Sequence, residues 1–208
     1  MRRLAVYAAV LAVLLVAWFV ADRGRAPEPE AFHGTYLGDG MPAPAFTLRS
    51  ADGPVALRDF RGQTVALFFG YASCPDFCPT TLAKLARVRD ALGGKGEELR
   101  VVLVTVDPER DDAERLARYV ANFDSSFVGL TGDLDTIRRV AMDYGIAFQK
   151  EEMPMDTAAM AGHEGHEGYL VNHGLYTQIV DEEGRIRLIW SADVTPARME
   201  EDLRRLLR

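Results

Sequence analysis

The 208 residues carry a net charge of −7, and no cluster of basic residues of the kind that phosphate backbones require is found in the sequence. This argues against nucleic acid as a partner. The length suffices for one membrane segment and one globular domain with a sizeable core, and it leaves little room for a second domain.

The N-terminal residues predict a membrane anchor. An unbroken apolar run from Leu4 to Ala21 follows two arginines and is long enough to cross a bilayer with some help from its flanks. A signal peptide would need small residues near its cleavage site, where this chain has Trp18, Phe19 and Val20. We therefore predict an uncleaved transmembrane helix over residues 1–21, with the N-terminus in the cytoplasm and the domain on the other side.

A tether is expected next. Residues 22–44 are rich in Pro, Gly, Ala and charged residues and show no sustained periodicity. His33 lies in this stretch, and we expect it to be a solvated loop residue. The compact domain is then expected over residues 45–208.

Within this domain, strands alternate with helices, and a hairpin and a last helix follow. Continuous apolar runs indicate central strands that are covered on both faces, and a polar cap followed by apolar residues at helical spacing indicates a helix. The expected strands are residues 45–48, 55–57, 64–70, 99–106, 127–130, 146–148, 169–171, 175–180 and 185–190. The expected helices begin at Thr80 or Thr81, at Asp111 or Asp112, at Asp133 and at Thr195-Pro196. The order predicts an α/β fold, a mixed sheet with helices on both faces in a thioredoxin-like layout.

The chain has only two cysteines, and they follow the first central strand. Cys74 and Cys78 should lie on the turn and at the start of the next helix, where four residues of helical rise separate their Cα atoms by about 6 Å. That spacing allows a disulfide or one soft metal ion between two thiolates. So short a loop constrains the unfolded chain little, which favours a functional pair over a structural disulfide. The pair is a redox couple, a metal clamp, or both in turn.

Three segments taken together resemble the Sco/SenC family of membrane-anchored copper-binding proteins, and the resemblance extends over residues 41–208. The segments are Gly70-Tyr71-Ala72-Ser73-Cys74-Pro75-Asp76-Phe77-Cys78-Pro79-Thr80-Thr81-Leu82, Val106-Asp107-Pro108-Glu109-Arg110-Asp111 and Tyr169-Leu170-Val171-Asn172-His173. The resemblance implies a copper metallochaperone in which Cys74, Cys78 and His173 bind the copper ion. Asp107 and Pro108 match a family motif close to the metal turn and are expected to support the site.

The resemblance also implies partners and a location. The acceptor would be cytochrome c oxidase subunit II, whose dinuclear copper site the protein helps to assemble, and a copper-donor chaperone would load it. The protein would be a single-pass protein of the bacterial inner (cytoplasmic) membrane with its domain in the periplasm. The chain departs from the family in having Asn172 where an aspartate is usual, and in a longer insertion over residues 151–168.

The insertion offers further ligands for a soft metal. It is expected to be an exposed loop, and its methionines and histidines either capture copper weakly and pass it on or are merely solvated. The two interpretations stay open. The side chains concerned are Met153, Met155, Met160, His163 and His166.

A second function also stays open. A membrane-anchored thiol-disulfide oxidoreductase could reduce the cysteines of the oxidase copper site through Cys74 and Cys78. Enzymes of this class usually have two residues between their cysteines, whereas this chain has three, which makes the alternative less favoured. His173 separates the two functions, because a reductase has no need of it.

Overall fold

The computed structural model describes residues 32–152 and 169–207. The predicted anchor over residues 1–21 lies outside them, as do the methionines and histidines of the insertion. Within the described ranges, no helix combines the length and the apolar character that a membrane crossing requires. The compact unit begins at His33.

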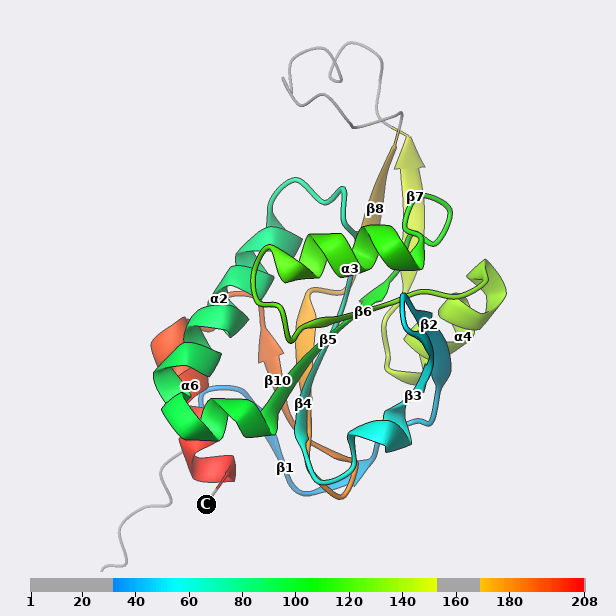
Figure 1. The fold of residues 1–208 in the computed structure, drawn as a ribbon. Helices are drawn as coiled ribbons and strands as arrows, with labels where there is room; N and C mark the ends of the chain where they lie inside the picture. The colour runs from blue at the N-terminus through cyan, green and yellow to red at the C-terminus, as the bar shows by residue number, and fades with distance from the viewer. Residues whose placement is uncertain (1–31, 153–168, 208) are drawn as a thin grey trace, which may run out of the picture. The chain divides into compact units, whose positions relative to one another are not determined.

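From β2 onward, the described strands and helices follow one another in the predicted order (Figure 1). In chain order they are β1 (Thr35–Pro42), β2 (Thr47–Ser50), β3 (Gly53–Ala56), the 3-10 helix η1 (Leu57–Phe60), β4 (Thr64–Gly70), α2 (Phe77–Leu92), η2 (Gly93–Glu98), β5 (Leu99–Thr105), α3 (Ala113–Ala121), β6 (Val128–Leu130), α4 (Leu134–Asp143), β7 (Phe148–Glu152), β8 (Tyr169–His173), β9 (Tyr176–Val180), β10 (Arg185–Ser191) and α6 (Pro196–Leu206).

Six of the strands form one mixed sheet in the order β1-β10-β9-β4-β5-β6. Strands β4, β5 and β6 are parallel, whereas β9 pairs antiparallel with both β4 and β10. All seven residues of β4 are buried, as expected for a central strand that is covered on both faces. Strands β2 and β3 form the predicted hairpin, and β7 and β8 form a separate two-stranded sheet.

Helices cover both faces of the main sheet, as predicted. Successive side chains of a strand point to opposite faces. On β4, the Phe69 ring packs against Tyr144 at the end of α4, with the ring centroids 5.6 Å apart, whereas Gly70 faces Cys78 of α2. Helix α6 lies beside α2 (Figure 1), and Lys84 Nζ donates to the Ala192 carbonyl at 2.7 Å. The thioredoxin-like layout is therefore present.

The prediction of a tether up to residue 44 is wrong for residues 35–42. These form β1, which pairs antiparallel with β10 from Thr35 opposite Ile189 to Pro42 opposite Arg185. The register shifts within β1, where Gly38 and Gly40 have positive φ angles. This irregularity removes the alternation by which a strand is recognised in a sequence.

His33 lies in an exposed bend, as predicted, but it has partners that the prediction did not include. Its backbone N–H donates to the buried Asp202 carboxylate at 2.9 Å, and its ring Nε2 lies 2.7 Å from Glu201 Oε2. The sequence does not reveal these contacts, because both partners lie almost 170 residues further along the chain.

Helix α2 begins earlier than predicted, at Phe77 instead of after Thr80 or Thr81. Pro79 is compatible with this start, because the first N–H groups of a helix have no partner within it. Asp112 and Asp133 do cap α3 and α4, by accepting from the backbone N–H groups of Arg115 and Thr136.

Candidate metal centre

The two cysteines lie where β4 leads into α2. Cys74 is partly exposed on the connecting turn, and Cys78 is fully buried in the first turn of the helix. The backbone N–H of Cys78 donates to Cys74 Sγ at 3.4 Å, so a free amide of the helix N-terminus is directed at the exposed sulfur. Neither cysteine is in a disulfide. The turn therefore presents one accessible and one buried thiol.

The cysteine turn is held from below by Asp111. This fully buried carboxylate accepts from the Ala72 backbone N–H at 2.9 Å and from Thr105 Oγ1 at 2.7 Å. Arg115 forms an ion pair with it at 3.4 Å and also donates to Ser73 Oγ at 2.7 Å. Our sequence reasoning considered Asp111 only as a helix cap and missed this role. The available signal was its place in the second of the three segments that carry the resemblance, Val106 to Asp111.

His173 reaches the cysteines from the end of β8. Its Nε2 lies 3.8 Å from Cys78 Sγ, and its Nδ1 lies 3.0 Å from the Gly174 carbonyl oxygen. A carbonyl only accepts, so Nδ1 carries a proton, and in the neutral ring the lone pair is on Nε2, on the sulfur side. The ring packs edge-on against Tyr71 and Phe68, with centroid distances of 6.0 and 6.4 Å.

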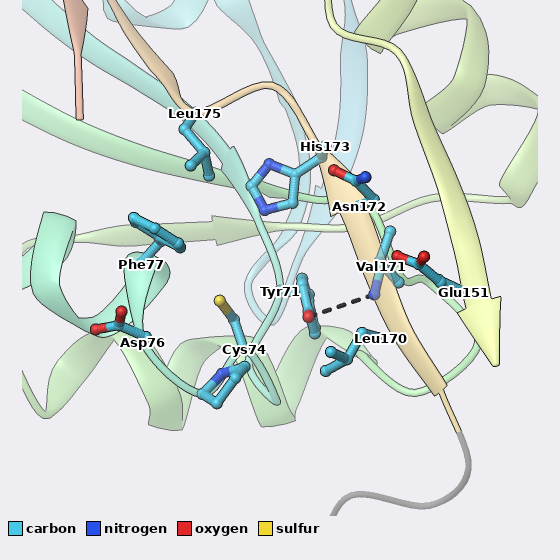
Figure 2. Close-up of a pocket in the computed structure, with 11 residues that line it drawn as sticks. Tyr71, Cys74, Asp76, Phe77, Glu151, Leu170, Val171, Asn172, His173 and Leu175 are labelled. Carbon is cyan, nitrogen blue, oxygen red and sulfur yellow. Dashed lines mark hydrogen bonds between the residues drawn. The ribbon is translucent and has the colours of Figure 1, made fainter. Parts of the chain in front are cut away.

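A cavity of about 270 Å³ opens beside these side chains. Figure 2 shows Cys74 and His173 pointing toward one another across it. The remaining lining is mostly apolar, with exposed carboxylates at Asp76 and Glu151. The apolar lining residues are Tyr71, Pro75, Phe77, Leu170, Val171 and Leu175.

The two thiols share one proton. The hydrogen bond from the Cys78 thiol is the largest influence on Cys74 and, against the opposing effect of burial, lowers the pKa of Cys74 to about 4; the hydrogen bond from the Cys78 amide adds to this effect. The same hydrogen bond, followed by burial, raises the pKa of Cys78. At neutral pH the pair is thus a thiolate at the accessible position and a thiol at the buried one.

The structure brings all three predicted ligands to one place, although they come from distant parts of the sequence. In residues 32–152 and 169–207, no three Cys, His, Asp or Glu side chains are already close enough to form a ready-made metal site. The ligand set therefore remains a prediction, and binding would require small side-chain movements.

Asp107 lies beside the site without pointing at the sulfurs. It is buried, accepts from Tyr169 Oη at 2.8 Å and is ion-paired with Arg110. It thus joins the end of β5 to the start of β8. Asn172 is exposed and contributes to the rim of the cavity.

Comparison with known proteins gives a consistent family assignment. The SCO1/SenC family profile matches residues 38–208. The mitochondrial protein SCO2 homolog of Bos taurus is 31% identical over 211 residues, which cover 98% of this chain and 74% of that protein.

Two solved structures resemble the fold closely. The solution structure of apo Sco1 from Thermus thermophilus is 38% identical, with a TM-score of 0.73 over 86% of this chain and 99% of that one. The crystal structure of Arabidopsis thaliana ScoI with copper bound is 27% identical, with a TM-score of 0.70 over 80% and 98% of the two chains.

Proposed function

The chain belongs to the SCO1/SenC family, and from this membership and the geometry of the site we propose that it is a copper metallochaperone. Cys74, Cys78 and His173 would hold one copper ion as cargo. The observation that carries the proposal is the 3.8 Å separation of Cys78 Sγ and His173 Nε2, two atoms that belong to residues 95 positions apart in the sequence.

That separation suits two ligands of a single ion. Thiolate sulfur and imidazole nitrogen bind first-row metal ions such as zinc at about 2.3 and 2.0 Å. With these bond lengths, a sulfur and a nitrogen that lie 3.8 Å apart make an angle of about 120° at the ion. This is the angle of a three-coordinate site, with Cys74 as the third donor. Copper(I) prefers soft thiolate and imidazole ligands and accepts low coordination numbers.

Histidine and cysteine are also in suitable protonation states. The Gly174 carbonyl holds the proton on His173 Nδ1, which leaves Nε2 to bind a metal, as is usual for metal-binding histidines. Cys74 is already a thiolate at neutral pH, so copper needs to displace a proton only from Cys78.

Delivery would proceed by ligand exchange from the open side of the cavity. Cys74 is the accessible sulfur and Cys78 is buried, so an incoming thiolate of the acceptor would replace Cys74 first. The acceptor would be cytochrome c oxidase subunit II, as the family resemblance implies, and a copper-donor chaperone would supply the ion. Residues 1–21 would anchor the protein in the bacterial inner membrane, with the domain in the periplasm.

The test is a copper titration of the reduced full-length protein against a chromophoric chelator. His173→Ala should weaken the affinity more than about 100-fold, beyond the 10- to 100-fold effect of losing an outer partner. His33→Ala, which removes a histidine bonded to Glu201 away from the site, should leave the affinity unchanged. Equal affinity in His173→Ala and the parent would refute the proposed ligand set.

A thiol-disulfide oxidoreductase is the second candidate, and the unequal pair of thiols favours it. An accessible thiolate beside a buried thiol is the arrangement that attacks disulfides. His173→Ala should spare disulfide exchange. If the parent protein carried out exchange and bound no copper, the reductase would become the better assignment.

The pH dependence of alkylation tests this thiol pair directly. The thiolate is the reactive form, so the rate of Cys74 alkylation by iodoacetamide should be constant at neutral pH and fall as the pH drops through about 4. Cys78 should stay unmodified in the folded protein because it is fully buried. In guanidinium chloride both should react with a midpoint near 9. A midpoint near 9 for Cys74 in the folded protein would contradict the assignment.

A further inference from the structure

Strand β8 carries His173 but is not part of the sheet that carries the cysteines. Among the described strands it pairs only with β7, so the histidine lies outside the main-sheet ladder, separated by two residues from β9, which joins that ladder beside β4. Backbone groups of alternate residues in such a strand face away from its partner. In β8, two backbone groups, the Tyr169 carbonyl and the Val171 N–H, are instead hydrogen-bonded by two side chains from the part of the site that carries the cysteines.

The first of these side chains is Tyr71, which follows β4 on the cysteine turn. Its hydroxyl oxygen accepts from the Val171 backbone N–H at 3.3 Å, a bond drawn in Figure 2. Its ring also packs edge-on against the His173 ring, with centroids 6.0 Å apart. Tyr71 is buried and belongs to the same turn as Cys74, so its side chain is fixed relative to the cysteines.

The second is Arg110, which follows β5. Its Nε is ion-paired with the buried Asp107 carboxylate, and its Nη1 donates to the Tyr169 carbonyl at 3.2 Å. The guanidinium also lies over the Tyr169 ring, 3.8 Å from its centroid, and 5.8 Å from the centroid of the Tyr71 ring. One planar cation thus contacts both the start of β8 and the residue that opens the cysteine turn.

We infer that Tyr71 and Arg110 are positioning residues that set the distance between His173 Nε2 and Cys78 Sγ. They hold the free edge of β8 at Tyr169 and Val171, and His173 is the next residue on that side of the strand. The inference deepens the proposed function, and the second of its two tests, which measures copper affinity, rests on that function. It assigns these residues no contact with the metal.

The first arm needs no metal. In the reduced, metal-free, full-length protein, the nuclear Overhauser effect between the His173 ring and the Cys78 β-protons should weaken at least about twofold in Arg110→Met and in Tyr71→Phe. Arg110→Lys, which keeps the charge but not the planar fork, should be intermediate.

Two matched controls separate positioning from a general loss of stability. Arg89→Met removes an arginine that also joins a carboxylate, Asp124, to a backbone carbonyl, that of Gly96. Tyr144→Phe removes a hydroxyl that also bonds the backbone, at Pro44. Both should preserve the effect between His173 and Cys78. An undiminished effect in Arg110→Met and Tyr71→Phe would overturn the inference, as would an equal loss in the controls.

The second arm is a double-mutant cycle on copper affinity. Arg110→Met alone should weaken binding about 10- to 100-fold, as expected for a residue that orients a ligand. In the His173→Ala background it should have no further effect, because the ligand it positions is gone. An equal loss in both backgrounds would show that Arg110 does not act through His173. If the parent bound no copper, the proposed function would fail and the metal-free arm would still decide this inference.

Discussion

The two halves of the site are supported in different ways. The sulfur half follows β4, which is hydrogen-bonded on both sides by β5 and β9 and is buried along its whole length. The histidine half ends β8, which belongs to a two-stranded sheet and has only Val171 fully buried among its five residues. Main-chain ladders hold the sulfurs, and side chains hold the histidine.

The difference teaches that one candidate site can combine a firmly held part with a less firmly held one. Under the proposed function, the less firmly held imidazole would leave the ion at low cost once a thiolate of the acceptor has replaced Cys74. Here the part with few buried contacts carries the imidazole, and the fixed part carries the two sulfurs. This comparison makes predictions that do not depend on the metal.

The largest expected effect is on amide hydrogen exchange. Amides of β4 such as Leu67 should exchange only by global unfolding, whereas amides of β8 should exchange through local opening, at least about 100-fold faster, a difference of about 2.7 kcal/mol in opening free energy. The measurement is native-state exchange of the reduced, metal-free protein followed by NMR. Equal protection of the two strands would show that the halves are equally rigid.

A smaller effect is expected from adding a methyl group to each half. At Gly70, a Cβ would lie 2.9 Å from Cys78 Sγ and 2.8 Å from the buried Phe68 ring, and Gly70→Ala should cost about 1–3 kcal/mol because this core has no room to yield. At Gly174 the nearest atom is the tip of Ile146, at 3.1 Å. Gly174→Ala should therefore cost less than about 1 kcal/mol.

Denaturant unfolding measures both changes. Gly94→Ala is the control, because nothing lies within 4 Å of a Cβ placed there. If Gly174→Ala lowered the free energy of unfolding more than Gly70→Ala, the claim that the sulfur half is the more rigid one would be contradicted.

The smallest effect concerns Asp111 under the sulfur half. Burial raises the pKa of Asp111 above its usual value of 3.8. Compared with the unfolded chain, the folded protein therefore favours the protonated form of this side chain. This contribution to stability is present below pH 3.8 and is lost as the pH rises through the higher pKa of the folded state. Asp111→Asn cannot ionise and should not show that loss. Unfolding free energies of the two proteins, measured from pH 3 upward, should diverge with this sign; parallel curves would contradict it.

Much of the fold was predictable because its signals are local. The apolar runs of β4 and β5 and the caps Asp112 and Asp133 were recognised from neighbouring residues alone. The prediction failed at β1, and it did not include the contacts of His33, because the partners on β10 and α6 are distant in the sequence. The start of α2 was predicted at Thr80 or Thr81 instead of Phe77, although the first turn of a helix accepts a proline such as Pro79.

The sequence by itself determined the sulfur half of the candidate site, because a strand that leads into a helix places two cysteines four residues apart one helical turn from each other. It also singled out His173, through its motif. Only the tertiary structure decided that His173 lies 3.8 Å from Cys78 and that Tyr71 and Arg110 hold its strand. The physical reason is that side-chain contacts between segments 60 to 100 residues apart leave no periodic pattern in the chain, whereas helical and strand geometry do.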